Sequence, residues 1–175
     1  MNLHEYNNII LLGMPGAGKS TVGILLAKAQ AKNFIDTDLL IQRYEQTSLQ
    51  NIIDKKGYIA LREIEELILL QLQCEHTVVA TGGSVIYSVQ GMKHLQCLGP
   101  VVFLDVSLSE LSRRITDYDQ RGIAGKPEQS FEQLFDERRQ LYLKYADITI
   151  NCNGSGLEQV MGRISSELNL RNLCR

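Results

Sequence analysis

The sequence lacks the residue patterns that build metal centres and disulfide frameworks. Its four cysteines form no Cys-x-x-Cys pair, and its three histidines are scattered and form no His-x-x-x-His or His–Cys cluster. Such spacing is typical of reduced thiols and of structural or surface histidines. The sequence therefore argues against a zinc site and against a small disulfide-stabilised fold.

Long apolar runs and a strong excess of charge are also missing. The densest apolar run, Leu67 to Leu72, is interrupted by Gln71 and is far too short to span a bilayer. The first six residues have neither the basic region nor the apolar stretch of a signal peptide. The net charge is −2, whereas nucleic-acid-binding proteins favour a basic face. We therefore expect a cytoplasmic protein that binds neither a membrane nor a nucleic acid, and we expect a monomer.

What the sequence contains is enough apolar residues for one packed domain. It has 175 residues, of which 44% are hydrophobic, and we expect a single domain over residues 1–175. Five short runs that are rich in β-branched or apolar residues, and bounded by Gly, Pro, Asp or Asn, are typical of strands. They are Ile9–Leu12, Phe34–Asp36, Thr77–Thr81, Val101–Asp105 and Ile148–Ile150.

Helical patterns separate these runs. Residues 21–31 carry apolar residues at helical spacing. Ser107 and Ser130 each begin a capping box, and Ser48 is expected to cap a short helix that ends near Gly57, ahead of a longer helix. Strands that alternate with helices predict an α/β fold, a five-stranded parallel sheet with helices on both faces.

Two segments have the character of inserts on this sheet. Residues 38 to about 75 form a helical excursion between the second and third strands. Residues 116–129 are polar, with two glycines, one proline and almost no apolar side chains. A loop of this length in a compact domain is usually functional or disordered, so we expect a mobile lid.

The most specific motif is a complete phosphate loop, because residues 13–20 read Gly-Met-Pro-Gly-Ala-Gly-Lys-Ser. It lies between an expected strand and an expected helix, which is the context that this motif needs. Its glycines let backbone N–H groups surround phosphate oxygens, and the helix start adds a positive dipole end. Lys19 is the natural partner of the β- and γ-phosphates, and Ser20 of Mg²⁺. The expected nucleotide-binding residues are Gly13, Met14, Pro15, Gly16, Ala17, Gly18, Lys19, Ser20 and Thr21.

Two carboxylates, Asp36 and Asp38, follow the second expected strand. Ligands bind at the carboxyl edge of an open parallel sheet. One carboxylate can hold Mg²⁺, and the other can accept a hydrogen bond from a hydroxyl and take its proton. The alternative is that Asp38 caps the following helix, and capping does not exclude substrate binding.

Several cations and a glycine pair complete the candidate site. Arg62 lies in the helical insert, where Glu65 can hold it as an i,i+3 pair. Any single arginine is typical of a solvated surface, but several that flank a lid after a phosphate loop favour phosphoryl transfer. The other candidates are Gly82 and Gly83 after the third strand, Arg113 and Arg114 before the expected lid, Arg121 and Lys126 within it, and Arg138 and Arg139 after it.

The order and spacing of these elements resemble the shikimate kinase family of small P-loop kinases over nearly the whole chain. The resemblance implies a P-loop NTPase fold like that of nucleoside monophosphate kinases, ATP and Mg²⁺ as cofactors, and phosphorylation of the 3-hydroxyl of shikimate. It rests on Gly13–Ser20, Asp36-Thr37-Asp38, Leu61-Arg62-x-x-Glu65, Gly82-Gly83, Arg121 and Glu137-Arg138-x-x-Leu141-Tyr142.

The resemblance implies roles for the residues of the reaction centre. Ser20 and Asp36 would serve the metal ion. Asp38 would contact the reacting hydroxyl as the candidate base. Arg121 would close over the phosphates with the lid, so that Lys19, Asp38 and Arg121 form the expected catalytic set.

It also implies roles in ligand binding. Arg62 and Arg138 would grip the substrate carboxylate, a task suited to a planar guanidinium. Gly82 and Gly83 would line the acceptor pocket. Arg113 would stack near the adenine.

The chain departs from the family pattern at several positions. The family usually has a third glycine, which is Ser84 here, and Gly-Glu-x-x-Phe-Arg, in which the Glu and Phe positions are Tyr58 and Leu61 here. The family's Arg-Pro in the lid is Arg-Gly here, with Gly122, and the proline of its Arg-x-Pro-Leu-Tyr is Gln140. These changes fall at the acceptor pocket and the lid, and the residues expected to bind the nucleotide are intact.

The acceptor therefore stays open at the level of the sequence. Shikimate is the leading candidate, and another small carboxylate-bearing alcohol, such as homoserine or gluconate, is the alternative. A nucleoside monophosphate kinase would need a base-recognition pocket, for which we find no pattern. A non-catalytic nucleotide-binding regulator would have no need of a paired-aspartate base beside a carboxylate clamp.

Overall fold

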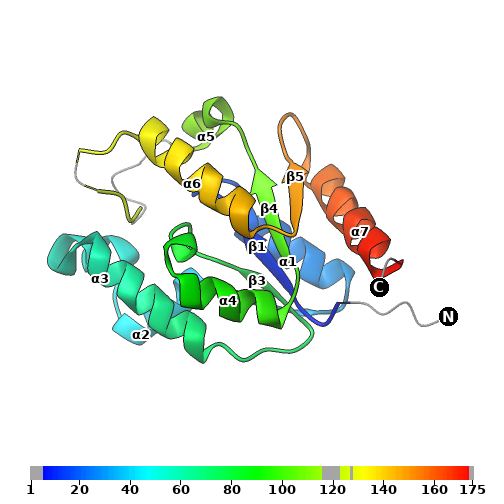
Figure 1. The fold of residues 1–175 in the computed structure, drawn as a ribbon, viewed down its shortest axis with the longest axis horizontal. Coiled ribbons are helices and arrows are strands. Elements are labelled where there is room, and N and C mark those ends of the chain that lie inside the picture. Colours follow the sequence, from blue (N-terminus) through cyan, green and yellow to red (C-terminus); the bar gives the residue numbers. More distant parts are fainter. Residues whose placement is uncertain (1–5, 116–122, 127, 174–175) are drawn as a thin grey trace.

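A five-stranded parallel sheet forms the centre of the molecule (Figure 1). The computed structural model describes residues 6–115, 123–126 and 128–173. The strand order is β2-β3-β1-β4-β5, and each neighbouring pair is parallel. All five expected strands are present, each within one residue of the expected bounds. They are β1 (Ile9–Leu12), β2 (Asn33–Asp36), β3 (Thr77–Ala80), β4 (Val101–Asp105) and β5 (Ile148–Asn151).

Helices cover both faces of the sheet, which confirms the predicted fold class. Helices α1 and α7 pack against each other behind it in Figure 1, and α4 and α6 lie in front. Strands buried on both faces are apolar throughout, and Ile9–Leu12 of β1 are each at most 1% exposed. The helices are α1 (Lys19–Ala29), α2 (Thr37–Glu45), α3 (Leu49–Gln71), α4 (Val89–Leu98), α5 (Leu108–Arg114), α6 (Phe131–Tyr145) and α7 (Leu157–Leu173), with one 3₁₀ turn, η1 (Val85–Tyr87).

The helix caps follow the sequence signals with one exception. Ser130 forms the complete capping box that was predicted, and Ser48 caps α3. Ser107 caps α5, but the prediction of a full capping box there is wrong. The carboxylate of Glu110 binds Arg114 and the Gly154 N–H, while the Ser107 N–H donates to Asn153. The Glu110 carboxylate and the Ser107 N–H, which would bind each other in a full capping box, thus have other partners.

The helical insert between β2 and β3 consists of α2 and α3. Its cap is Asp36, whose carboxylate accepts from the Asp38 N–H, so Asp38 lies inside the first turn rather than at the cap. Within α3 the chain kinks at Gly57 (φ 85°, ψ 165°), where the sequence predicted the end of one helix and the start of another. The second half of α3 then passes η1 and α4 and ends near Asn8, at the amino edge of the sheet.

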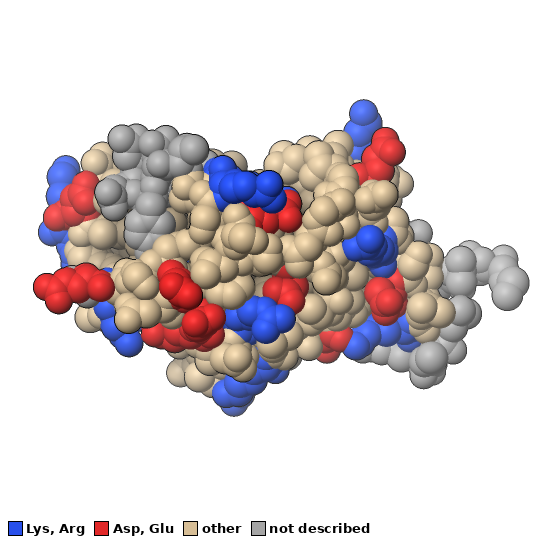
Figure 2. Space-filling view, turned by 90° about the horizontal axis from the view of Figure 1, so that it is seen from above, with Lys and Arg blue, Asp and Glu red and all other residues tan. Residues whose placement is uncertain are grey.

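Most of the expected lid, including Arg121 and Gly122, lies outside the described residues. On the face shown in Figure 2, basic and acidic side chains are interspersed rather than gathered by sign. No helix in the described part of the chain is long and apolar enough to cross a membrane.

Candidate functional site

The phosphate loop turns between β1 and α1 at the carboxyl edge of the sheet and surrounds Lys19. This side chain is only 9% exposed, and its Nζ donates to the carbonyl oxygens of Gly13 (2.8 Å) and Met14 (3.0 Å). Burial lowers the pKa of Lys19 to about 8, against a smaller opposing effect of Asp38. The ammonium therefore remains charged at neutral pH inside a nest of backbone groups. The side chains of Met14 and Ala17 are buried in the core, so only their backbone faces a ligand.

Ser20 and Asp36 present a pair of oxygens beside this lysine. The Ser20 hydroxyl donates to Asp36 Oδ2 at 2.6 Å, and the Asp36 Oδ1 atom is held by the Asp38 N–H at 3.0 Å. Mg²⁺ prefers oxygen ligands and is usually held by one or two protein groups together with substrate phosphates. Among the described residues there is no group of three or more His, Cys, Asp or Glu side chains that could cage a metal alone. The sparse oxygen pair fits a phosphate-bound Mg²⁺.

Two cavities meet at Asp38. The outer cavity, of about 470 Å³, is open and is lined by the phosphate loop, Ser20, Thr21 and Arg114. The inner cavity, of about 60 Å³, lies between α3, the turn after β3, and α6. Pro15, Lys19 and Asp38 line both cavities, so these three residues stand between them.

Asp38 carries the electrostatics of a base. Burial raises its pKa to about 6, against the opposing effect of the Lys19 ammonium. At pH 7 the carboxylate is mostly ionised while its proton affinity is raised, which suits a group that accepts a proton near neutral pH.

Two arginines converge at the inner cavity. Arg62 Nη2 and Arg138 Nη2 both donate to the carbonyl oxygen of Ala124, at 2.9 and 2.8 Å. Arg138 is only 1% exposed, and within the described residues its Nε atom and that of Arg62 have no hydrogen-bond partner. Two guanidinium groups aimed at one oxygen form a site for an anion.

The carboxylate of Glu65 is a member of the site to which the sequence gave no role beyond holding Arg62. It is 3% exposed and accepts a hydrogen bond from the Ser84 hydroxyl at 2.5 Å. The expected ion pair with Arg62 does not form among the described residues. Burial and the charge of Asp38 raise the pKa of Glu65 to about 7. The carboxyl instead packs against Gly82, where an added Cβ would lie 2.1 Å from Glu65 Oε1 and 2.6 Å from Asp38 Oδ1.

The turn that holds Gly82, Gly83 and Ser84 lies against α3 and forms one wall of the inner cavity. Gly83 and Ser84 line the inner cavity, while Gly82 lies behind it with its N–H bonded to Thr37 Oγ1. The Gly83 carbonyl accepts from the buried Tyr142 hydroxyl at 2.6 Å. A residue that the family pattern does not share therefore places a hydroxyl in the pocket wall.

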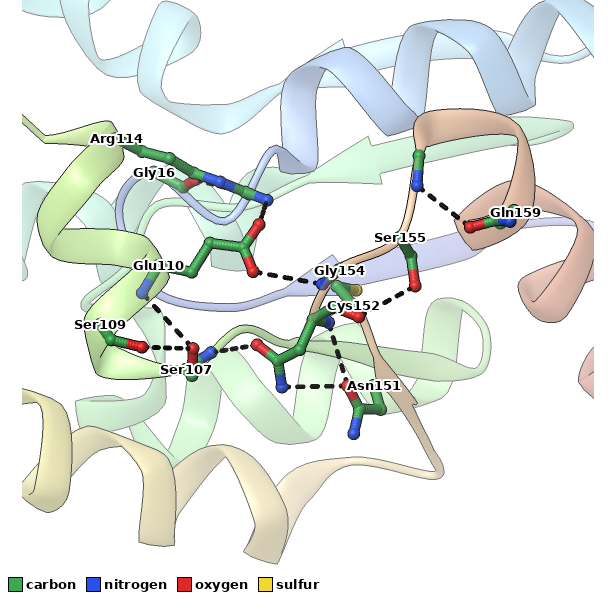
Figure 3. Close-up of polar contacts among 12 residues, drawn as sticks. Gly16, Ser107, Ser109, Glu110, Arg114, Asn151, Cys152, Gly154, Ser155 and Gln159 are labelled. Carbon is green, nitrogen blue, oxygen red and sulfur yellow. Dashed lines mark hydrogen bonds and ion pairs between the residues drawn. The ribbon is translucent and has the colours of Figure 1, made fainter.

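On the nucleotide side the structure brings Arg114 to the phosphate loop, whereas Arg113 does not line the outer cavity. Figure 3 shows how Arg114 is held, since its guanidinium pairs with Glu110 and donates to the Gly16 carbonyl at 3.4 Å. Glu110 also accepts from the Gly154 N–H, which ties α5 to the turn after β5. Sequence spacing could not separate the two neighbouring arginines, because their difference lies in which side of α5 faces the loop.

The remaining basic candidates have other partners or are not described. Arg139 forms two hydrogen bonds with Asp105 at the end of β4, and so serves the fold. Lys126 pairs with Glu137 at 3.5 Å. The position of Arg121 lies outside the described residues.

Comparison with protein-family models finds a match to the model described as shikimate kinase, over residues 15–169. A curated shikimate kinase of Sulfurihydrogenibium sp. is 35% identical over 168 residues, which cover 94% of this chain and 99% of that protein. A shikimate kinase of Rippkaea orientalis is 37% identical over 149 residues, 83% of this chain and 79% of that protein.

Solved structures give the same result. The structure of shikimate kinase from Acinetobacter baumannii in complex with shikimate has a TM-score of 0.84 and 30% identity, and the match covers 93% of this chain and 92% of that one. Thymidylate kinase from Candida albicans, with a TM-score of 0.59 and 15% identity over 96% of this chain and 93% of that one, shares the fold alone.

Proposed function

The chain belongs to the shikimate kinase family, and from this premise we propose that it transfers the γ-phosphoryl group of ATP to the 3-hydroxyl of shikimate. The observation that carries the choice of acceptor is the convergence of Arg62 and Arg138 on one oxygen in a cavity that Asp38 also lines. A carboxylate oxygen is the ligand that two guanidinium groups bind best. An acceptor held there by its carboxylate has its hydroxyl groups directed toward Asp38.

The shared wall of the two cavities defines the transfer path. Asp38 accepts the proton of the acceptor hydroxyl as the hydroxyl oxygen attacks the γ-phosphorus from the inner cavity. The bond between the γ-phosphorus and the β,γ-bridging oxygen breaks, and ADP leaves on the side of the outer cavity. Lys19 moves from the loop carbonyls to the phosphate oxygens and balances the charge that spreads over them. Phosphoryl transfer needs positioning and charge stabilisation more than covalent chemistry, and this site supplies both.

Ser20 and Asp36 would hold Mg²⁺, and a bound Mg²⁺ would neutralise the charge that develops on the phosphates. The 2.6 Å contact of the two side chains places both oxygens at one point beside the phosphate loop. On the other side of the loop we assign Arg114, in place of Arg113, to the adenine. Arg114 is the arginine that lines the outer cavity.

Two other functions fit parts of the site. A kinase of another carboxylate-bearing alcohol would use the same arginines, and the hydroxyl of Ser84 in the pocket wall favours keeping this alternative. A non-catalytic nucleotide-binding regulator fits the phosphate loop, but it gives no role to the convergence of Arg62 and Arg138 on one oxygen.

An ADP-release assay with the purified protein tests the proposal. We expect turnover that depends on shikimate, with much lower or no turnover on homoserine and gluconate. Turnover with homoserine or gluconate alone would identify that compound as the acceptor in place of shikimate. ATP binding without release of ADP for any of the three compounds would support a non-catalytic nucleotide-binding regulator. The monomeric state and cytoplasmic location stay predictions, and sedimentation would test the first.

A further inference from the structure

The guanidinium group of Arg62 lies on the ring of Tyr87. The Arg62 Cζ atom is 3.6 Å from the centroid of this ring and 5.0 Å from the centroid of the Tyr58 ring. Tyr87 belongs to the 3₁₀ turn that follows Ser84, whereas Tyr58 lies one turn before Arg62 on α3. The Arg138 Cζ atom is 5.6 Å from the same Tyr87 centroid.

These ring contacts take the place of the carboxylate partner that two neighbouring cations would be expected to have. Arg62 and Arg138 lie close enough for the charge of each to disfavour the other, and burial and this repulsion both lower the pKa of Arg62. Even so, neither arginine pairs with a carboxylate in the part of the chain that the structure describes. The electron-rich faces of the tyrosines therefore supply the compensation that a buried cation needs.

An aromatic face and a carboxylate compensate an arginine in different ways. A carboxylate binds the N–H groups at the edge of the guanidinium plane, and it would compete with an acceptor for them. A ring stacks on the plane and leaves that edge free. In this structure Arg62 Nη2 donates toward the inner cavity and Arg62 Nε has no partner, so the edge is available.

Tyr87 is itself held in place. Its hydroxyl donates to Glu137 at 2.6 Å, and Glu137 also accepts from Gln129 at 2.9 Å and pairs with Lys126 at 3.5 Å. The Tyr87 hydroxyl is thus tied to α6 through Glu137, a carboxylate that the segment leading into α6 also holds.

We propose that Tyr87 is a positioning residue for the acceptor, whose ring orients the Arg62 guanidinium so that its free edge faces the acceptor carboxylate, with Tyr58 as a weaker second support. This inference rests on the proposed function, because it assumes a carboxylate-bearing acceptor in the inner cavity.

Steady-state kinetics with shikimate test the assignment through Tyr87→Leu and Tyr87→Phe. For Tyr87→Leu we expect the KM for shikimate to rise roughly five- to twentyfold, because the ring is lost, with kcat and the KM for ATP within about twofold. Tyr87→Phe keeps the ring and loses only the bond to Glu137, so we expect a rise of about two- to threefold. Tyr44→Leu, which removes an exposed tyrosine from α2, is the matched control and should leave all three constants unchanged.

A double-mutant cycle with Arg62→Ala separates positioning from general support of the fold. If Tyr87 acts through Arg62, Tyr87→Leu should raise the KM for shikimate less than about twofold in the Arg62→Ala background. An effect of the same size in both backgrounds would refute the assignment, as would an unchanged KM in Tyr87→Leu. Should Tyr87→Leu fail to fold, the Tyr87→Phe value decides, and a KM equal to that of the wild type counts against the proposal. Wild-type protein without shikimate-dependent turnover would instead overturn the proposed function.

Discussion

The proposed role of Asp38 as a base makes the reaction rate depend on pH. Its carboxyl has to be ionised to accept a proton, and burial raises its pKa to about 6. We expect kcat/KM for the acceptor to be about half of its maximum near pH 6, to fall further at lower pH and to level off above about pH 7, since this ratio reports groups of the free enzyme.

The matched variant is Asp38→Asn, which keeps the size of the side chain and removes the base. Its kcat should be lower by about 10²–10⁴-fold, while calorimetry should find ATP binding nearly unchanged. A wild-type profile that is flat from pH 5 to 7.5 would remove Asp38 from this role.

Glu65 predicts a pH dependence of stability rather than of rate. Its pKa is raised from 4.5 to about 7 in the folded protein. The folded state then binds more protons than the unfolded state between these values, so the free energy of unfolding decreases as the pH rises through this window. Glu65→Gln removes the titration and keeps an acceptor for Ser84, so we expect the variant to gain stability relative to the wild type at pH 7.5 and much less at pH 4.5.

Urea unfolding at the two pH values measures this difference. Glu63→Gln, at an exposed position of the same helix, is the control and should show the same small change at both. Equal changes in Glu65→Gln at both pH values would contradict the raised pKa.

The roles of individual residues could be predicted from the sequence where the residue directly follows a strand. They could not be predicted where the role depends on a contact with a residue far away in the sequence. Asp36 and Asp38 were predicted because the end of β2 must lie at the ligand edge. Glu65 was predicted to hold Arg62 because helical spacing allows it, yet Ser84 from a distant segment binds it instead. The choice of Arg114 over Arg113 likewise depends on the packing of α5.

The element that determines the geometry of the acceptor pocket is α3, and its kink is a backbone feature. Gly57 has φ 85° and ψ 165°, a conformation that residues with a side chain rarely adopt, although there is open space around it. Gly57→Ala should therefore lower the free energy of unfolding by about 1–3 kcal/mol. It should also raise the KM for the acceptor, because the half of α3 after the kink carries Arg62.

Gly162→Ala is the comparison, since Gly162 lies within α7, also in open space and without a positive φ. Alanine there should stabilise the protein by about 0.5–1 kcal/mol. Chemical denaturation measures the free energy of unfolding of both variants. An unchanged free energy of unfolding in Gly57→Ala would show that alanine fits the kink without strain.

Element boundaries were predictable wherever a local signal sets them. The capping box at Ser130, the helix cap at Ser48 and the kink at Gly57 each depend on a segment of only four or five residues. The half-formed box at Ser107 was not predictable, because its Glu110 is drawn away by Arg114 and Gly154, which come from the same helix and from a turn that follows β5. Long-range partners override a local motif when they offer charge.

At the scale of the whole molecule, a buried asparagine joins several elements at the edge of the sheet opposite the site. Asn8 lies at the amino edge, is 3% exposed, donates to the carbonyls of Cys74 and Leu98, and accepts from the Thr77 N–H. It joins the ends of α3 and α4 to the start of β3. Asn8→Ala leaves these groups unpaired and should cost about 2–4 kcal/mol in the free energy of unfolding.

The same variant should leave both KM values unchanged, because the site lies at the carboxyl edge. Asn169→Ala, on the exposed side of α7, should change stability by less than about 0.5 kcal/mol. Kinetic effects of Asn8→Ala at a temperature where it is fully folded would contradict this separation.

The overall fold was open to prediction because alternating strands and helices leave few arrangements. Strand order, which the sequence alone left unspecified, decides which strand ends meet. With β3 between β1 and β2, the glycine turn after β3 comes to lie against both the phosphate loop and Asp38.

The contact of Arg62 and Arg138 with the Ala124 carbonyl has a consequence for selectivity. An arriving acceptor exchanges with a neutral peptide oxygen that already accepts one hydrogen bond from each of the two cations. A carboxylate brings an opposite charge and can bind a guanidinium through two parallel hydrogen bonds, whereas an uncharged oxygen can do neither. An anion therefore gains from the exchange, and an uncharged alcohol gains little. The Ala124 carbonyl thus competes with any ligand for the two arginines. Only a molecule that binds them more strongly than this carbonyl does can displace it, and the site therefore discriminates against neutral molecules.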